Sequence, residues 1–340
     1  MTASRGAHHR SNRLLLVAAC VIGRSLNHRR GCAVLPGPSP WSSWETRDGL
    51  RVDSRRPEWH GRLARRAALA GGSGDEHERA EFLVAHEARH GRWAYEGLAQ
   101  AMCNRGHAVH FLSLPRLGDD ARADEAALAG ALEAVRGLHG AGQHLVVLGH
   151  GLSATSLCRC LAAAADPAAL CAAAVLAAPW PLRAGVERQA LAAAAAAASD
   201  EGLCRRLMFS PGAAGEDVGD TEQSAEDVAF CVSGLRLSEP LADEAPASAA
   251  AAPALERCLA AGSALSDRIL VVGGGADALV PQEALDEIAD AFLAGDPIVM
   301  EGCGHTGRGR GLFLDSRSSK DAAGVVLDWT RLLFSCGYLA

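Results

Sequence analysis

From Glu81 onward, short hydrophobic runs alternate with longer segments of helical periodicity. The short runs are typical of strands buried on both faces. We expect strands at Phe82–Ala85, Val109–Leu114, His144–Leu148, Ala173–Ala177, Ile269–Val272 and Ile298–Met300. We expect helices at Tyr95–Arg105, Asp124–Leu138, Ser153–Ala164, Gln282–Phe292 and Ala322–Phe334. This alternation predicts an α/β fold, with a mostly parallel sheet covered by helices on both faces.

Two parts of the chain depart from this alternation. Ahead of it, Trp44–Val52 predicts two short strands around an Asp48–Gly49 turn, and a loose Arg- and Gly-rich link follows over about residues 55–76. Between about residues 180 and 266 we expect only helical pieces, at Arg183–Ala198, Glu201–Met208, Ser224–Val232 and Ala254–Ala261. We expect this insertion to form a lid over the carboxyl edge of the sheet. A helical excursion with no gating role is the alternative.

The first 43 residues differ in composition from the rest of the chain. They hold no acidic residue and six arginines, and Leu14–Gly23 is an apolar run behind a basic start. This run is too short to cross a bilayer core of about 30 Å as a helix, so we expect no stable membrane span. An Arg-rich, acid-free leader resembles a plastid or mitochondrial transit peptide, with a secretory signal or an untargeted cytoplasmic tail as alternatives. We therefore expect residues 1–43 to lie outside a single folded domain over residues 44–340.

Composition narrows the classes of function. The formal net charge of −7 gives no reason to expect nucleic-acid binding. The eleven cysteines include no C-x-x-C pair, which in a chain of 340 residues is typical of reduced thiols that fill small core spaces. We expect no disulfide framework, no metal centre and no cofactor.

One segment has the pattern of a catalytic turn. Leu145–Ala154 is a buried strand run that enters Gly149-His150-Gly151-Leu152-Ser153, in the G-x-S-x-G frame of a nucleophile elbow. Gly151 stands where this frame has its reactive serine. Glycine suits the bend but has no side chain to react. The segment therefore predicts the fold, while the nucleophile position lacks a side chain.

Further motifs follow in a fixed order along the chain. They are His86 with Ala88–Trp93 and Asn104–His107, then Leu112–Gly118, Val271–Pro281 and Glu301–His305. Together with the elbow they resemble the α/β-hydrolase superfamily, in particular its small esterase- and lipase-like members, from Trp44 to the carboxyl end. The resemblance implies an α/β-hydrolase fold with a helical lid insertion, with Asp277 as triad acid and His305 as triad base. The alternatives are a helix-capping role for Asp277 and a structural role for His305.

The same resemblance assigns the rest of the site. It implies that the N–H groups of Leu152 and of the loop around Ala88 hold the oxyanion. It also places His86, Glu87 and His150 around the pocket.

Two substitutions count against ordinary ester hydrolysis. Loss of a triad nucleophile costs on the order of 10⁶ in turnover, and Glu87 stands where the family has the glycine of a His-Gly pair. A carboxylate there repels the developing negative charge unless it is protonated or turned away. We therefore expect a protein that is impaired as a serine hydrolase and binds a small apolar or ester-like molecule, or a partner. We also expect Gly151→Ser to raise ester hydrolysis.

Three other hypotheses use these residues differently. Asp277 and His305 would act as a general-base dyad on a substrate or water in the space beside Gly151. Ser153 would serve a weak esterase, although it lies about 200° around the helix from position 151 and is expected to face the sheet or a neighbouring helix. The segment His86–His90 matches the H-E-x-x-H motif of zinc peptidases, without a clear third ligand. The sequence leaves the oligomeric state open.

Overall fold

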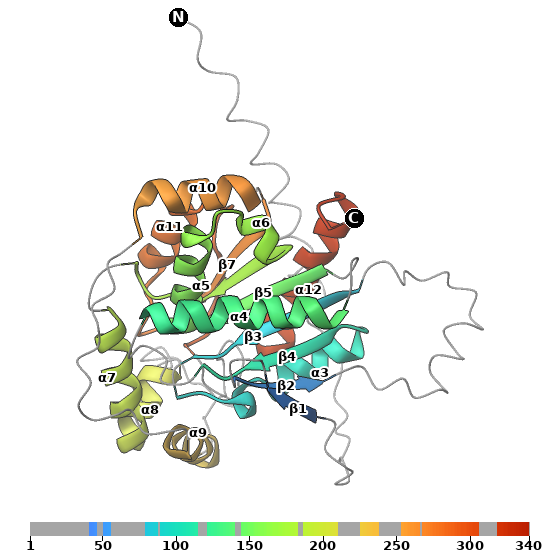
Figure 1. The fold of residues 1–340 in the computed structure, drawn as a ribbon. Helices are drawn as coiled ribbons and strands as arrows, with labels where there is room; N and C mark the ends of the chain where they lie inside the picture. The colour runs from blue at the N-terminus through green and yellow to red at the C-terminus, as the bar shows by residue number, and fades with distance from the viewer. Residues whose placement is uncertain are drawn as a thin grey trace, which may run out of the picture.

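The computed structural model describes residues 41–45, 50–55, 79–87, 89–114, 121–139, 144–182, 186–209, 225–237, 253–265, 267–305 and 318–339. At its centre is an eight-stranded sheet in the order β1-β2-β4-β3-β5-β6-β7-β8 (Figure 1). The strands are β1 (Trp41–Glu45), β2 (Arg51–Arg55), β3 (Ala80–Ala85), β4 (Ala108–Leu112), β5 (His144–His150), β6 (Ala173–Ala177), β7 (Ile269–Gly274) and β8 (Ile298–Met300). β2 pairs antiparallel with β1 and β4, and the strands from β4 to β8 are parallel. The expected α/β fold with a mostly parallel sheet is confirmed.

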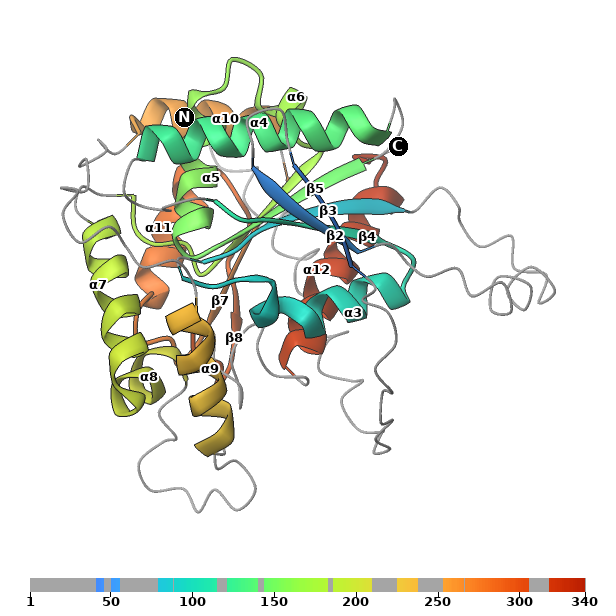
Figure 2. The same cartoon turned by 60° about the horizontal axis from the view of Figure 1, so that its bottom comes forward.

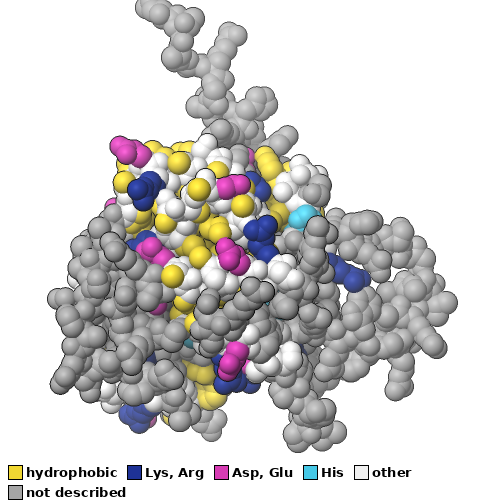
Figure 3. Space-filling view, viewed as in Figure 1, with side chains coloured by type: hydrophobic (Ala, Val, Ile, Leu, Met, Phe, Trp, Pro, Cys, Tyr) yellow, Lys and Arg dark blue, Asp and Glu magenta, His cyan; other side chains and the backbone are white. Residues whose placement is uncertain are grey.

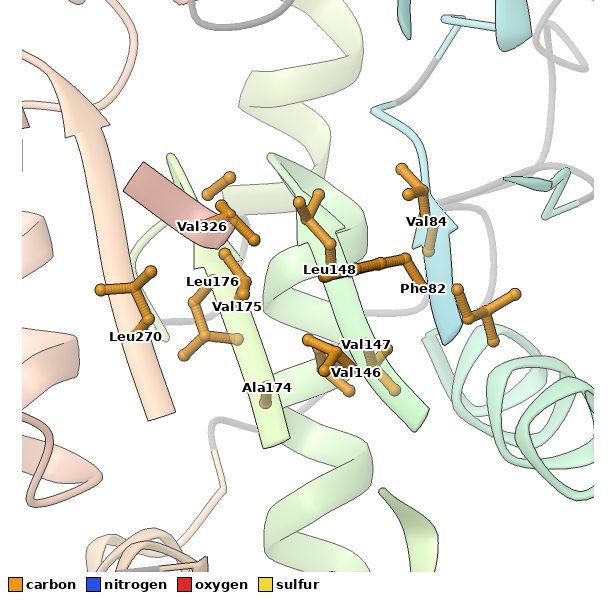
Figure 4. Close-up of a cluster of buried hydrophobic side chains, with 14 of the residues drawn as sticks. Phe82, Val84, Val146, Val147, Leu148, Ala174, Val175, Leu176, Leu270 and Val326 are labelled. Atoms are coloured by element: carbon orange, nitrogen blue, oxygen red, sulfur yellow. The ribbon is translucent and has the colours of Figure 1, made fainter. Parts of the chain in front are cut away.

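The parallel strands form where the sequence has short apolar runs. All six lie within two residues of their expected ends. β3, β6 and β7 are buried along their whole length, since helices cover both faces of the sheet. Figure 4 shows Val84 of β3, Leu148 of β5 and Leu176 of β6 in one core with Val326 of α12 (Ser318–Ser335). The apolar runs therefore determine where these strands end, and so where the carboxyl edge of the sheet lies.

The first strand starts earlier than the composition indicates. β1 begins at Trp41, inside the expected leader, and pairs with β2 in the register Trp41↔Arg55. Ser42 and Ser43 are exposed on this edge strand, so hydrophobicity does not mark it. The expected turn, almost all of the link and residues 1–40 lie outside the described residues, and the organellar location stays a prediction.

Helices cover the sheet on both faces (Figure 2). On one face, α3 (Glu96–Asn104) packs against α12 and follows the 3-10 turn η1 (Arg92–Tyr95). The other face carries α4 (Ala121–His139), α5 (Leu152–Ala163), α6 (Pro167–Leu170) and α11 (Gln282–Ala291). α5 begins directly after β5, and this connection forms the bend that the sequence predicts.

Three helices of the insertion form a small unit beside the sheet. These are α7 (Val186–Ser199), α8 (Glu201–Met208) and α9 (Ala225–Leu237), which pack against one another (Figure 1). They enclose their own apolar cluster, which includes Met208 and Val232. The insertion therefore has a core of its own and does not merely extend the main one.

The last helix of the expected insertion belongs to the body of the fold. α10 (Leu255–Leu265) packs against α5, α6 and α11, because its apolar face, with Cys258 and Ala261, joins the main core. The separate unit thus ends before α10 and not at residue 266. On the face shown in Figure 3, apolar side chains are interspersed with acidic and basic ones. Among the described helices, none has the length and apolar character that crossing a membrane requires.

Candidate functional site

The bend between β5 and α5 has the backbone expected of a nucleophile elbow. β5 ends at His150, Gly151 has φ 60° and ψ −121°, and α5 begins at Leu152. A positive φ of this kind favours glycine. At Gly149 an added Cβ would lie 2.6 Å from the Cα of Ala154, so only glycine fits where α5 approaches β5. The sequence therefore builds the sharp turn at the carboxyl edge of the sheet.

His305 and Asp277 meet at this edge from two different loops. Asp277 follows β7, His305 follows β8, and the distance from His305 Nδ1 to Asp277 Oδ2 is 2.7 Å. The other carboxylate oxygen of Asp277 accepts hydrogen bonds from the N–H groups of Leu279 and Val280, at 2.8 and 3.0 Å. Asp277 therefore organises the turn ahead of α11 and orients the imidazole of His305 at the same time.

Glu87 reaches the opposite nitrogen of the same imidazole. It follows β3, and its Oε2 lies 3.2 Å from His305 Nε2. The N–H of Leu152 donates to both carboxylate oxygens, at 3.1 and 3.0 Å, and the indole N–H of Trp180 donates to Oε2 at 3.3 Å. The side chain of Glu87 is buried, so these hydrogen bonds replace the water that its carboxylate has lost. The expected oxyanion donor at Leu152 thus holds a carboxylate of the chain itself.

The space beside Gly151 is filled by this carboxylate. A Cβ built on Gly151 would lie 1.2 Å from Oε2 and 2.2 Å from Cδ of Glu87. The expected room for a substrate or water beside Gly151 is therefore occupied. The physical reason is local. The Leu152 N–H and His305 Nε2 offer hydrogen-bond donors to a carboxylate, and glycine at position 151 has no side chain in the space that the Glu87 carboxylate fills.

The two carboxylates determine the charge of His305. Burial alone would lower its pKa, but the charge and hydrogen bond of Asp277, together with those of Glu87, raise the pKa to about 10. His305 is therefore protonated at neutral pH and donates from both ring nitrogens. The sequence indicated that a carboxylate at position 87 repels a developing oxyanion unless it is protonated or turned away. In the structure the Glu87 side chain lies at the donors of Leu152 and His305, and its oxygens accept the hydrogen bonds themselves.

A second hydrogen-bonded chain supports the backbone of Glu87. The N–H of Glu87 donates to the hydroxyl of Tyr95 at 3.0 Å, and this hydroxyl is 2.7 Å from Nδ1 of His150. Burial, and then the positive charge of His305, hold the pKa of His150 well below its ordinary value, so Nδ1 accepts a hydrogen bond that the Tyr95 hydroxyl donates. The rings of His150 and His305 are stacked at 5.1 Å between centroids. Sequence reasoning missed Tyr95 and Trp180, which no local motif marks.

The other expected residues lie near the site but point elsewhere. His86 hydrogen-bonds to Ser113 Oγ at 3.3 Å and to the carbonyl of Glu87 at 3.1 Å. Burial lowers the pKa of His86. Ser153 is buried, and its hydroxyl donates to the carbonyl of His86 at 2.5 Å, toward the end of β3. Ala88 lies outside the described residues.

The helix that a zinc-peptidase motif requires is absent from the described part of residues 86–90. His86 and Glu87 continue the chain from β3, and His90 lies in the turn before η1, where its ring stacks on Trp93 at 5.7 Å between centroids. The two imidazoles therefore do not share a helical face, and this prediction is wrong. In the residues that the structure describes, no three or more His, Cys, Asp or Glu side chains gather in a way that could hold a metal ion.

Several solved structures have a similar fold. One, described as a candidate aryl esterase from Burkholderia cenocepacia, has a TM-score of 0.55 and 16% identity, over 87% of this chain and 99% of that one. A carboxylesterase structure from the thaumarchaeon Nitrososphaera gargenis has a TM-score of 0.54 and 10% identity, over 87% and 100%. A serine hydrolase involved in carbazole degradation has a TM-score of 0.50 and 13% identity, over 86% and 99%. At these identities the likeness shows the fold alone.

The family assignment comes from the sequence itself. Among curated protein sequences, none matches the chain. Residues 82–317 match the model of the alpha/beta hydrolase family. This match runs from β3 to the residue before α12 and includes the elbow, Asp277 and His305. The protein therefore belongs to the alpha/beta hydrolase family.

Proposed function

We propose that this family member does not hydrolyse esters by the serine route and instead binds a small molecule or a partner. The observation that carries the proposal is the position of Glu87. Its Oε2 lies 1.2 Å from the point where a side chain at position 151 would begin. The carboxylate therefore replaces the missing serine side chain as the hydrogen-bond partner of His305.

The charge of His305 supports this proposal independently of the missing nucleophile. A serine triad needs a neutral histidine that takes the hydroxyl proton. Asp277 and Glu87 raise the pKa of His305 to about 10, so the base is already protonated at neutral pH. Position 151 thus has no attacking oxygen, and at neutral pH His305 has no free nitrogen that could take a proton.

The small helical unit α7–α9 is part of the proposal as a lid. Phe230 of α9 meets Trp93 of η1 at 5.6 Å between ring centroids, in an edge-to-face contact. The η1 turn ends with Tyr95, whose hydroxyl supports Glu87. This contact supports a coupling between the insertion and the loop that carries the carboxylate.

The test compares ester hydrolysis by the parent, Gly151→Ser, Glu87→Gly and the double variant Glu87→Gly/Gly151→Ser. A serine side chain at position 151 requires the Glu87 carboxylate to leave its three hydrogen-bond donors, so Gly151→Ser alone should give little gain. The double variant has both a nucleophile and a free His305. It should hydrolyse short-chain p-nitrophenyl esters at least 100-fold faster than either single variant, because a triad acts as a unit. A fluorophosphonate probe should label only the double variant, at residue 151.

Ser153→Ala in the parent is the matched control, and it should change neither the rate of ester hydrolysis nor the labelling by the fluorophosphonate probe. Two results would contradict the proposal. The first is a parent that labels at Ser153, which would identify a weak esterase. The second is a Gly151→Ser variant as active as the double variant, which would show that Glu87 does not block the position.

A general-base enzyme is the second candidate, and the short hydrogen bond between His305 and Asp277 favours it. Such an enzyme needs Glu87 to leave His305 Nε2 before a substrate or water is deprotonated. The carbonyl and hydroxyl substrates that this chemistry serves would then be turned over by Glu87→Gly, which has no serine at position 151.

A further inference from the structure

Three buried donors converge on one point at the carboxyl edge of the sheet. They are the backbone N–H of Leu152, the indole N–H of Trp180 and the imidazole Nε2–H of His305, and each is buried. Leu152 is the first residue of the 12-residue helix α5, whose amino end adds a partial positive charge. The donors come from three separate segments and meet at a single oxygen, Oε2 of Glu87.

The geometry points to a carboxylate-binding site, and we propose that Glu87 is its internal ligand. The class of free ligand that fits is a small monocarboxylic acid, which enters as the anion when Glu87 leaves. This inference rests on the proposed binding function and adds the chemical class of the ligand. Glu87 then does more than fill the space beside Gly151, because the three donors recognise the carboxylate as a ligand.

The donor set selects a carboxylate over neutral groups. The Leu152 N–H contacts both oxygens of one carboxylate, which a single-oxygen acceptor such as an alcohol cannot match. His305 contributes a positive charge that favours an anion. Asp277 lies on the far side of the imidazole, at 2.7 Å from Nδ1, and fixes the ring so that Nε2 points at the ligand.

The two loops that bring Glu87 and Trp180 to the site carry unusual backbone conformations. Arg89, two residues after Glu87, has φ 58°, and Ala178, two residues before Trp180, has φ 42°. Non-glycine residues with positive φ cost free energy and persist where the surrounding structure holds them. Asp267 and Leu293 also have a positive φ, so the donors at Glu87, and not the backbone conformation, carry the proposal.

The size of the ligand follows from the atoms of Glu87. Beyond Cα its side chain is a propionate unit, of two methylene carbons and a carboxylate. Glu87→Gly therefore removes the equivalent of propionate, and Glu87→Ala, which keeps Cβ, removes the equivalent of acetate. Each variant should thus bind a different acid at the same three donors.

The test titrates full-length Glu87→Gly, Glu87→Ala, Glu87→Gln and the parent with sodium propionate, sodium acetate and propionamide, by isothermal titration calorimetry. Glu87→Gly should bind propionate at least tenfold more tightly than the parent does, and at least tenfold more tightly than it binds propionamide. Glu87→Ala should prefer acetate to propionate. Glu87→Gln keeps a side chain of the same size at the three donors and should bind propionate no better than the parent.

Trp180→Phe in the Glu87→Gly background removes one donor and should weaken propionate binding several-fold. Near-ultraviolet circular dichroism checks that each variant is folded. Should Glu87→Gly not fold, Glu87→Ala with acetate against acetamide decides the question. A folded variant that binds the acid no more tightly than the amide would overturn the proposal. None of these variants has a serine at position 151, so this failure would leave the double-variant esterase test, and the proposed function, untouched.

Discussion

Glu87 and Gly151 form a reciprocal pair. Position 151, where the sequence motif predicts a serine, carries glycine, and position 87, where the resemblance implies a glycine, carries glutamate. Serine at 151 would collide with the carboxylate, and glycine at 87 would leave the Leu152 N–H and His305 without their acceptor. A buried donor without a partner costs about 1–3 kcal/mol. Each substitution therefore fits the other.

Tyr95 gives a prediction at the same scale. Tyr95→Phe removes the hydroxyl that accepts from the Glu87 N–H and donates to His150, both of which are buried. We expect the free energy of unfolding to fall by about 1–3 kcal/mol in urea denaturation. Tyr338→Phe is the matched control, because that ring is 43% exposed, and it should cost about 0.5 kcal/mol or less. Equal effects of the two substitutions would show that the Tyr95 hydroxyl does not support the loop.

The sequence predicted some residues of the site and missed others. Asp277 and His305 were found because each lies in a short motif after an apolar strand. Trp180 and Tyr95 were not, because no motif marks them and their side chains join separate segments of the chain. The hydrogen bond of Trp180 with Glu87 spans 93 residues, and that of Leu152 with Glu87 spans 65. Local patterns predict where a loop lies but not which side chains meet across loops.

For helices and strands, length and polarity decide what the sequence predicts. The parallel strands were predicted to within two residues, since each contains a short apolar run, and β3, β6 and β7 are buried along their whole length. β1 was placed too late because its serines are exposed. α6 was missed because its four residues are too few for a periodic pattern, although Asp166 caps it and Pro167 starts it.

The contact between α10 and α11 gives a prediction for helix packing. A Cβ on Gly262 of α10 would lie 1.9 Å from the backbone oxygen of Phe292 at the end of α11. Gly262→Ala should therefore push the helices apart and lower the free energy of unfolding by about 1–3 kcal/mol. In α12 the same change at Gly324 meets nothing within 4 Å. Gly324→Ala should raise the stability by about 0.5–1 kcal/mol, because alanine favours the helix. Thermal unfolding of both variants separates these outcomes, and a neutral Gly262→Ala would contradict the packing.

For the molecule as a whole, the parallel sheet is what assembles the site. Glu87, Gly151, Asp277 and His305 follow β3, β5, β7 and β8, and parallel strands bring their carboxyl ends to one edge. The protonated state of His305 therefore depends on the fold, because its two carboxylate partners, Asp277 and Glu87, are not close to it or to each other in the sequence. The fold was predictable from strand order and motifs, whereas this charge state required the three-dimensional arrangement.

The charge of His305 is the most direct measure of whether Glu87 has taken the serine's place. The measurement is a pH titration of the His305 ring by ¹⁵N NMR in the parent and in Glu87→Gln, with His305→Gln to assign the signals. The account predicts that His305 stays protonated through neutral pH and loses its proton near its raised pKa of about 10, and that Glu87→Gln lowers this pKa. A His305 that titrates near the ordinary value of about 6.5 in the parent, unchanged by Glu87→Gln, would contradict it.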